Sequence, residues 1–342
     1  MKIVQDSNYP NQKAKNSISE KKSSLLKGVD PKILESFELQ EFLGSGSESE
    51  VYKAYIKNSK RTVAMKMILL KKNQRININE INISKKLKNK NIINFYVAGE
   101  FKRNELYCII TEYAKFGNLL QFQQKIKEEK KNLSEPLICF ITYQILNGLK
   151  YCHLCKIVHF DIKPQNIIID NCLNIKIIDF SISLDYSKIK SNQIKLPLRG
   201  TSIYISPEVI KSDNVYIKDL NKIDLYSLGI ILYNLAFNSF PFSLEFEDIN
   251  NYDIIYEKIM KELTINNESH KYSSYFIDFI NKLLEKDINK RININEALNN
   301  YWVKGAEILF EEKEKICNDD IFLNDLIYKH FKKFENYIIK KS

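Results

Sequence analysis

Residues 159–181 read HFDIKPQNIIIDNCLNIKIIDFS, and this stretch decides the fold. Two short runs of apolar, mostly β-branched residues, Ile167–Ile169 and Ile175–Ile178, flank Asp170-Asn171-Cys172. This pattern predicts a hairpin between buried strands. Because both ends of a hairpin meet on one side, polar residues just before and just after it are brought together.

The polar residues that flank the hairpin suggest a reaction site. Asp161 and Asn166 precede the first strand, and Asp179 follows the second. A hard cation such as Mg²⁺ takes oxygen ligands and leaves part of its shell for phosphates. We therefore expect Asn166 and Asp179 to bind the cation and Asp161 to orient a hydroxyl nucleophile. For either acid alone, the alternative of a loop carboxylate without a function stays open.

This order of residues resembles the catalytic loop and the magnesium motif of protein kinases, with HFD for HRD and DFS for DFG. The resemblance extends over about residues 37–303. It implies an α+β, two-lobed protein-kinase-like fold, with a small N-lobe of antiparallel sheet and one main helix and a larger, mainly helical C-lobe. It also implies ATP and Mg²⁺ as cofactors and protein substrates that bear Ser or Thr hydroxyls.

The resemblance also sets the expected domain boundaries. The first residues, 1–36, are rich in Lys, Ser and Asn and predict a disordered tail. We expect a kinase domain over 37–303, with the N-lobe at 37–111, the hinge at 112–116 and the C-lobe at 117–303. Residues 304–342 have helical spacing and predict an extension that packs on the domain or binds a regulatory partner.

A glycine turn lies near the start of the predicted domain, in FELQEFLGSGSESEVYKAYI. Gly44 and Gly46 would let the backbone approach phosphates, whose oxygens loop N–H groups can meet. Val51 follows at the spacing of the kinase glycine-rich loop, whose third glycine is Ser49 here. By resemblance, the ATP-binding residues of this loop are Leu43, Gly44, Ser45, Gly46 and Val51.

The next two segments carry a lysine and a glutamate. In RTVAMKMILL, a predicted strand, Ala64 and Lys66 share one face by the two-residue period. In INEINISKKLKNKNII, Glu80, Ile83 and Leu87 have helical spacing, so the carboxylate lies on the inward face. Lys66 and Glu80 resemble the strand-lysine and helix-glutamate pair of kinases, in which the lysine binds the α and β phosphates.

The segment LYCIITEYAKFGNLLQF predicts a strand that runs into a turn. By resemblance, Glu112 to Ala114 form the hinge whose backbone binds adenine, and Ile168 belongs to the ATP-binding residues. Thr111 takes the gatekeeper position. Because threonine is small, we expect bulky ATP-site inhibitors to reach a back pocket.

Three further segments of the predicted C-lobe support the catalytic loop. Ser134 to His153 have helical spacing, with Ser134 as the N-cap. By resemblance, Asp224, in the buried helix KIDLYSLGIILYNLAF, holds the catalytic-loop backbone. By the same resemblance, Glu208 of SPE is expected to pair with Arg291.

The resemblance assigns the chemistry to Asp161, Lys163, Asn166 and Thr201. Asp161 orients the substrate hydroxyl and accepts its proton late. Lys163, two residues later, resembles the lysine of serine/threonine kinases that contacts the transferred phosphate, and Thr201 is expected to meet both side chains.

Besides Ser49, Phe160 and Ser181 depart from the kinase pattern. Phe160 replaces the arginine that captures an activation-segment phosphate, so we expect activity that does not depend on this capture. Ser181 replaces the glycine of DFG and loses its freedom at positive φ, which would bias the Asp179-Phe180 flip. Such departures also occur in pseudokinase scaffolds, which bind nucleotide or partners without phosphotransfer, and this is the alternative function.

Composition limits the remaining classes. A chain of 342 residues with 44% hydrophobic residues can build a sizeable core, and its apolar runs are too short for a bilayer span. Six cysteines dispersed through strand-like and helix-like segments fit a reducing compartment, so we expect a soluble, cytoplasmic protein, with the nucleus left open. The net charge of +10 admits a nucleic-acid binder, but the lysines are scattered, which favours solvated faces and no nucleic acid.

Overall fold

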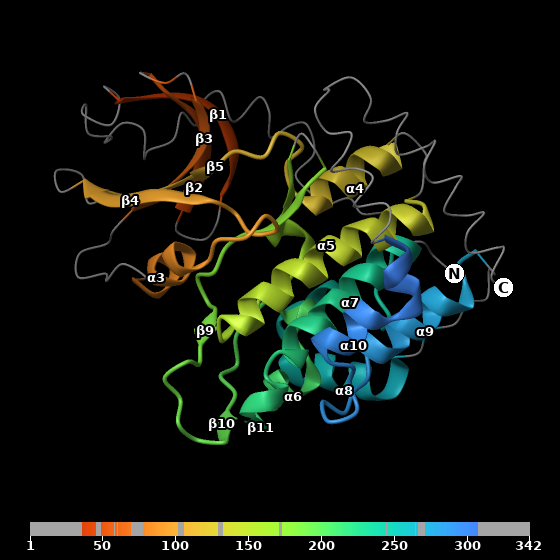
Figure 1. Ribbon diagram of the computed structural model, residues 1–342. Helices are drawn as coiled ribbons and strands as arrows, with labels where there is room; N and C mark the ends of the chain where they lie inside the picture. Colours follow the sequence, from red (N-terminus) through yellow and green to blue (C-terminus); the bar gives the residue numbers. More distant parts are fainter. Residues whose placement is uncertain are drawn as a thin grey trace. The chain divides into compact units, whose positions relative to one another are not determined.

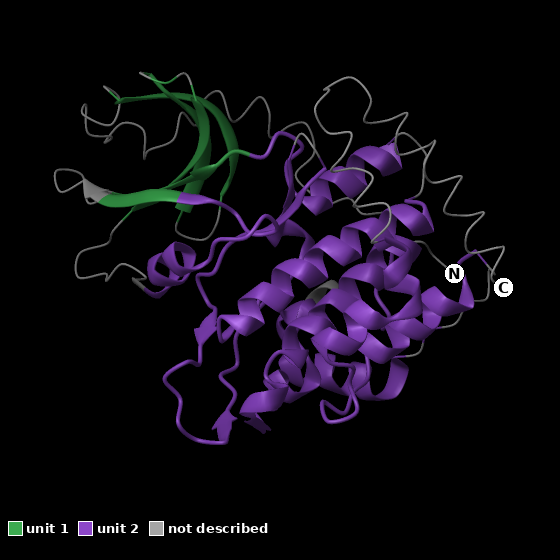
Figure 2. Ribbon diagram, in the orientation of Figure 1, with its two compact units in different colours: residues 1–76, 96–113 green, residues 77–95, 114–342 purple. Residues whose placement is uncertain are grey.

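A computed structural model describes residues 36–45, 49–57, 59, 61–69, 78–101, 106–128, 133–170, 173–243, 245–263, 265 and 271–306. The tail predicted over 1–36, except its last residue, and the extension predicted over 304–342, except its first three residues, lie outside this part, as does Gly46. The chain divides into two compact units, coloured separately in Figure 2. Unit 1 comprises residues 1–76 and 96–113, and unit 2 comprises residues 77–95 and 114–342.

Unit 1 is built on a five-stranded sheet with the order β1-β2-β3-β5-β4. The strands are β1 (Phe37–Ser45), β2 (Ser49–Ile56), β3 (Arg61–Leu69), β4 (Phe95–Phe101) and β5 (Leu106–Glu112). Each of the pairs β1/β2, β2/β3 and β3/β5 is antiparallel, as expected for a kinase N-lobe sheet.

The strand register aligns the residues that the sequence assigned to ATP. Val51 of β2 lies opposite both Gly44 of β1 and Lys66 of β3, and Ala64 of β3 lies opposite Thr111 of β5. Directly paired residues point to the same side of a sheet. Burial alternates along β3, and the half-buried face carries Ala64 and Lys66. The other face forms the apolar core of unit 1, with Tyr52, Ala54, Val63, Met65, Met67, Cys108 and Ile110.

Unit 2 is mainly helical (Figure 1). Its helices are α3 (Ile78–Lys86), α4 (Leu119–Glu128), α5 (Glu135–Leu154), α6 (Pro207–Ile210), α7 (Lys222–Phe237), α8 (Tyr252–Glu262), α9 (Ser274–Leu283) and α10 (Ile294–Asn299). Its short strands are β6 (Ile157–Val158), β7 (Ile167–Ile169), β8 (Ile175–Ile177), β9 (Leu184–Asp185), β10 (Gln193–Lys195) and β11 (Asn214–Tyr216). Its single-turn helices are η2 (Pro164–Asn166), η3 (Ser202–Tyr204), η4 (Ile217–Asp219) and η5 (Phe246–Asn250).

Helices α5 and α7 contact each other in the middle of unit 2 (Figure 1). Both are apolar around most of their circumference, which is typical of core helices. Helix α5 begins after Ser134, as predicted, but the serine side chain makes no cap hydrogen bond. Pro136 follows in the first turn and has no N–H, so this helix start offers fewer donors to a cap.

The hairpin predicted from the central stretch is confirmed. Strands β7 and β8 pair antiparallel, with Ile167 opposite Ile177 and Ile169 opposite Ile175. The amide of Ile178 donates to the carbonyl of Asn166 at 3.0 Å, which links the two ends of the hairpin. The loop that carries Asp161 and the residues that lead to Asp179 are therefore held together.

The contacts of α3 place this helix with unit 2 rather than with the predicted N-lobe range 37–111. Asn79 donates to the carbonyl of Ser183 at 3.0 Å. Lys86 donates to the carbonyl of Cys155 at 2.9 Å and pairs with Asp185 at 3.2 Å. These polar contacts hold α3 to the segments on either side of the hairpin.

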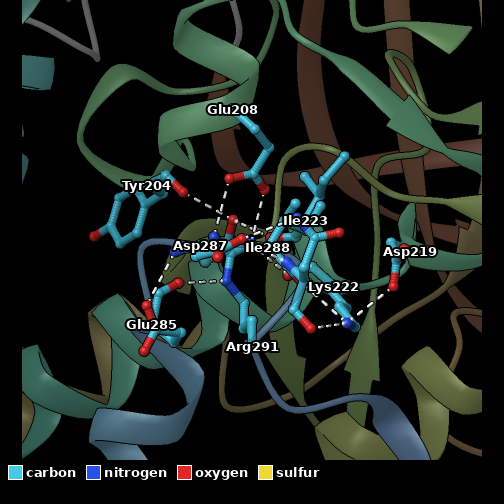
Figure 3. Close-up of polar contacts among 11 residues, drawn as sticks. Tyr204, Glu208, Asp219, Lys222, Ile223, Glu285, Asp287, Ile288 and Arg291 are labelled. Atoms are coloured by element: carbon cyan, nitrogen blue, oxygen red, sulfur yellow. Dashed lines mark hydrogen bonds and ion pairs between the residues drawn. The ribbon is translucent and has the colours of Figure 1, made fainter.

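The predicted ion pair between Glu208 and Arg291 is confirmed and lies at the centre of Figure 3. Arg291 donates to both carboxylate oxygens of Glu208, at 2.7 and 2.9 Å. It also donates to the carbonyls of Glu285 and Lys222, at 2.8 and 3.1 Å. The pair therefore joins the start of α6 to the start of α7 and to the loop after α9.

Candidate active site

The carboxylate of Asp161 is fixed by donors on both of its oxygens. Oδ1 accepts hydrogen bonds from the hydroxyl and the amide of Thr201, at 2.7 and 3.1 Å. Oδ2 accepts from Lys163 Nζ at 2.7 Å and from Asn166 Nδ2 at 2.9 Å. Asp161 retains 12% side-chain exposure, so the carboxylate is immobilised without being closed off.

Lys163 and Thr201 complete a triangle with this carboxylate. Lys163 Nζ donates to Thr201 Oγ1 at 2.7 Å, while the same hydroxyl donates to Asp161. Each side of the triangle is a direct contact, and Thr201 lies 38 positions after Lys163 and 40 after Asp161 along the chain. The prediction that Thr201 meets both the acid and the lysine is confirmed.

Asp224 holds the backbone of the catalytic loop, as predicted. Its side chain is fully buried at the start of α7 and accepts hydrogen bonds from the amides of His159 and Phe160, at 3.0 and 2.9 Å. His153 Nε2 contacts the same carboxylate at 2.9 Å, which makes this histidine a buried partner of the loop support.

His159 links the catalytic loop to the strand end that leads to Asp179. Its Nδ1 accepts from the amide of Asp161 at 3.2 Å, so its Nε2 carries the hydrogen that is donated to the carbonyl of Ile178 at 2.9 Å. The ring also contacts Phe180 edge-on, with centroids 5.0 Å apart. No role for this fully buried histidine was predicted from the sequence. A polar residue between the apolar run Ile157-Val158 and a loop acid is the signal that could have found it.

The backbone adopts the left-handed region at two residues of the site. Phe160 has φ 68° and Asp179 has φ 64°. Ser181 is not among the residues with positive φ. In this conformation the left-handed residue is Asp179, so Ser181 meets no demand for positive φ here, and the bias on the Asp179-Phe180 flip stays a prediction.

The predicted magnesium ligands have suitable chemistry. Asn166 uses Nδ2 to donate to the carbonyl and Oδ2 of Asp161, both at 2.9 Å, so Oδ1 is the amide atom left to accept a cation. Asp179 contributes carboxylate oxygens, one of which accepts from the amide of Ser181 at 3.3 Å. Over the described ranges, no group of three or more His, Cys, Asp or Glu side chains is arranged to hold a metal. Asn166 and Asp179 instead offer one amide and one carboxylate, whose oxygens fit Mg²⁺.

The residues predicted to bind ATP lie on both units. Thr111 is half-buried near the end of β5, and its hydroxyl donates to the carbonyl of Glu112 at 3.3 Å. Ala114 is the first residue of this segment in unit 2, and Ile168 is the half-buried central residue of β7. Lys66 belongs to unit 1, whereas Glu80, 7% exposed, belongs to unit 2. The pairing of these two residues stays a prediction.

Arg199 is a second residue of the site for which the sequence predicted no role. Its guanidinium lies over the ring of Phe160, 4.3 Å from the centroid, two residues before Thr201. Burial lowers the pKa of this guanidinium. The sequence signal is an aromatic residue in the catalytic loop, HFD, together with an arginine directly before Gly200-Thr201.

This fold and this group of residues are those of a protein kinase. The protein kinase domain family matches residues 37–303, and the chain belongs to this family, in its serine/threonine class. The chain is 32% identical to the serine/threonine-protein kinase pakH of Dictyostelium discoideum, over 80% of this chain and 50% of that protein. It is 32% identical to the serine/threonine-protein kinase TIO of Arabidopsis thaliana, over 82% of this chain and 20% of that protein.

A third relative is the serine/threonine-protein kinase ULK3 of Xenopus laevis, 31% identical over 81% of this chain and 57% of that protein. The alignments thus span between a fifth and three fifths of the length of these three relatives. Within the described part of the chain, no helix is both long and apolar enough to cross a membrane.

Proposed function

We propose that this protein transfers the γ-phosphoryl group of ATP to serine and threonine hydroxyls of protein substrates. The observation that carries the proposal is the triangle of Asp161, Lys163 and Thr201, in which all three contacts measure 2.7 Å. Such a group suits a reaction whose barrier is lowered chiefly by positioning and by charge stabilisation.

Each member of the triangle has a separate task in this mechanism. Asp161 orients the substrate hydroxyl, whose oxygen forms a bond to the γ-phosphorus as the bond from this phosphorus to the ADP oxygen breaks. The hydroxyl proton passes to Asp161 late in the step. Lys163 stabilises the charge on the transferred phosphoryl group, and Thr201 holds the acid and the lysine at a fixed separation.

The remaining residues bind the nucleotide and its cation. Asn166 and Asp179 would hold Mg²⁺, which neutralises part of the phosphate charge. We assign the α and β phosphates to Lys66, supported by Glu80, and the phosphate loop to Leu43, Gly44, Ser45, Gly46 and Val51. Adenine is assigned to the backbone of Glu112 to Ala114, with Ala64, Thr111 and Ile168 lining its site.

The test is phosphate transfer from labelled ATP and Mg²⁺ to generic protein substrates, with Asp161→Asn compared with wild type. We expect transfer to Ser or Thr, and a loss of about 10²–10⁴-fold in the variant. Asp253→Asn is the matched control, because Asp253 also pairs with a lysine, Lys211, at 3.3 Å but is 88% exposed. It should keep the wild-type rate.

The same experiment separates catalysis from a pseudokinase scaffold. If wild type transfers no phosphate but its thermal unfolding midpoint rises with ATP, the protein binds nucleotide without catalysing transfer. Equal transfer by wild type and Asp161→Asn would contradict the role of Asp161.

A further inference from the structure

Residues 199–201 contact the catalytic loop at consecutive points. The guanidinium of Arg199 lies 4.3 Å from the ring centroid of Phe160. Gly200 has φ 115°, and a Cβ there would lie 2.7 Å from the carbonyl oxygen of Phe160. Thr201 bonds to Asp161 through both its amide and its hydroxyl. The segment therefore lies against the loop in one register, with the Arg199 contact at its start.

The ring on which Arg199 lies is itself firmly held. Phe160 is 4% exposed, and its amide donates to the buried carboxylate of Asp224 at 2.9 Å. A cation over an aromatic face is attracted by the ring quadrupole, more strongly when the cation is desolvated. Among the described residues, Arg199 Nε and Nη2 are shielded from solvent and have no hydrogen-bond partner. For these two nitrogens, no hydrogen bond to a described residue supplements the contact of the guanidinium with the ring of Phe160.

We propose that Arg199 is a positioning residue for phosphoryl transfer: stacked on Phe160, it holds Gly200 and Thr201 against the catalytic loop. The positive charge of Arg199, on the segment, binds the ring of Phe160, on the catalytic loop. This contact takes the place of the one that a phosphate on the segment would make with a loop arginine. The inference rests on the proposed kinase activity and names a regulatory consequence of it. The site is assembled without phosphorylation of the segment.

The first measurement is turnover of phosphatase-treated protein, for wild type, Arg199→Met, Phe160→Leu and the double variant. We expect wild type to stay active and each single variant to lose about tenfold in kcat, equivalent to about 1.4 kcal/mol, with KM for ATP unchanged. The double variant should lose no more than either single variant, because both remove one interaction. Arg199→Lys keeps the cation and should recover part of kcat.

The second measurement is hydrogen exchange at the amide of Thr201, which donates to Asp161. It needs no catalysis, so it decides the inference even if wild type transfers no phosphate. We expect about tenfold faster exchange in Arg199→Met, with an unchanged thermal unfolding midpoint. Arg61→Met is the matched control, since Arg61 lies over Tyr96 at 4.8 Å in unit 1. It should change neither readout.

Three results would overturn the inference. The first is wild-type exchange at Thr201 in Arg199→Met, whether or not turnover falls. The second is a double variant whose loss is the product of the two single losses. The third is a wild-type protein that loses its activity on phosphatase treatment and regains it when residues 179–208 are rephosphorylated.

Discussion

Two carboxylate–cation pairs in unit 2 use the same chemistry in opposite ways. The pair of Glu208 and Arg291 is closed, with side chains 5% and 0% exposed and both carboxylate oxygens bound by one guanidinium (Figure 3). The pair of Asp161 and Lys163 is partly open, at 12% and 21%. Lys163 also donates a hydrogen bond to Thr201, and Asp161 also accepts one from Asn166.

The difference teaches that exposure and the set of partners, rather than residue type, separate a closed ion pair from the open one that we propose takes part in the reaction. Arginine presents a planar fork that saturates a buried carboxylate, whereas lysine presents a point charge that can move between acceptors. The closed pair is shielded from solvent and therefore from a substrate. The open pair meets a hydroxyl of its own chain, Thr201, in the way that we propose it meets a substrate hydroxyl.

The largest expected effect follows from breaking the closed pair. Arg291→Met should lower the free energy of unfolding by about 3–5 kcal/mol, because Glu208 is left buried and unpaired. Chemical denaturation measures this loss. Glu208→Leu combined with Arg291→Met removes both charges and should recover at least half of it. A loss below about 1 kcal/mol in the single variant would mean that water compensates the glutamate.

An intermediate effect is expected at Asp224. This residue is buried like the closed pair and also holds the backbone of the catalytic loop. Asp224→Asn keeps the shape but places an NH₂ group against donors from His159, Phe160 or His153. The unsatisfied donors should lower the free energy of unfolding by about 2–3 kcal/mol and also reduce kcat. Asp278→Asn, at an ion-paired surface aspartate that is 54% exposed, is the control. Reduced stability with unchanged turnover would limit Asp224 to a structural role.

Thr201→Val tests the open pair alone. The variant keeps the branched shape and removes the hydroxyl that links Lys163 and Asp161, while the direct contact of these two remains. We expect kcat to fall about tenfold and the free energy of unfolding to change by less than about 1 kcal/mol. Thr201→Ser should keep most of the activity. The opposite pattern, lost stability with full turnover, would make the triangle a structural feature like the closed pair.

The smallest expected effect concerns a third pair, which lies on the surface. Lys261 and Glu257 are 3.1 Å apart on α8 and are 73% and 66% exposed. Lys261→Met should change the free energy of unfolding by at most about 0.5 kcal/mol and leave kcat unaltered. Denaturation at low and high salt checks this. A loss above about 1 kcal/mol would show that exposure does not rank the three pairs.

The sequence predicted the parts of the site that depend on spacing along the chain. The hairpin, the buried helix with Asp224, and the contact of Thr201 with Asp161 and Lys163 all follow from periodicity and family pattern. It missed contacts between residues that have no pattern of their own. The stacking of Arg199 on Phe160 and the two hydrogen bonds of His159 depend on the exact path of two loops, which periodicity does not specify.

The backbone at one residue also shows what a family pattern leaves open. The expectation for Ser181 transferred the backbone demand of a glycine to the residue that replaces it. In this conformation the left-handed residue is Asp179 instead. A backbone dihedral angle is set by the contacts on both sides of a residue. The residue type alone therefore could not predict which residue adopts the left-handed region.

The left-handed angles at Phe160 and Asp179 have different consequences for stability. A residue with a side chain holds about 1–2 kcal/mol of conformational energy in this region, which glycine would not hold. Glycine at either position would relax the backbone but remove the ring on which Arg199 lies or the carboxylate assigned to the cation. At Phe160 the loss of a buried ring would outweigh this relief. Backbone strain alone therefore favours glycine only at Asp179, where the side chain is the carboxylate that we propose binds the cation.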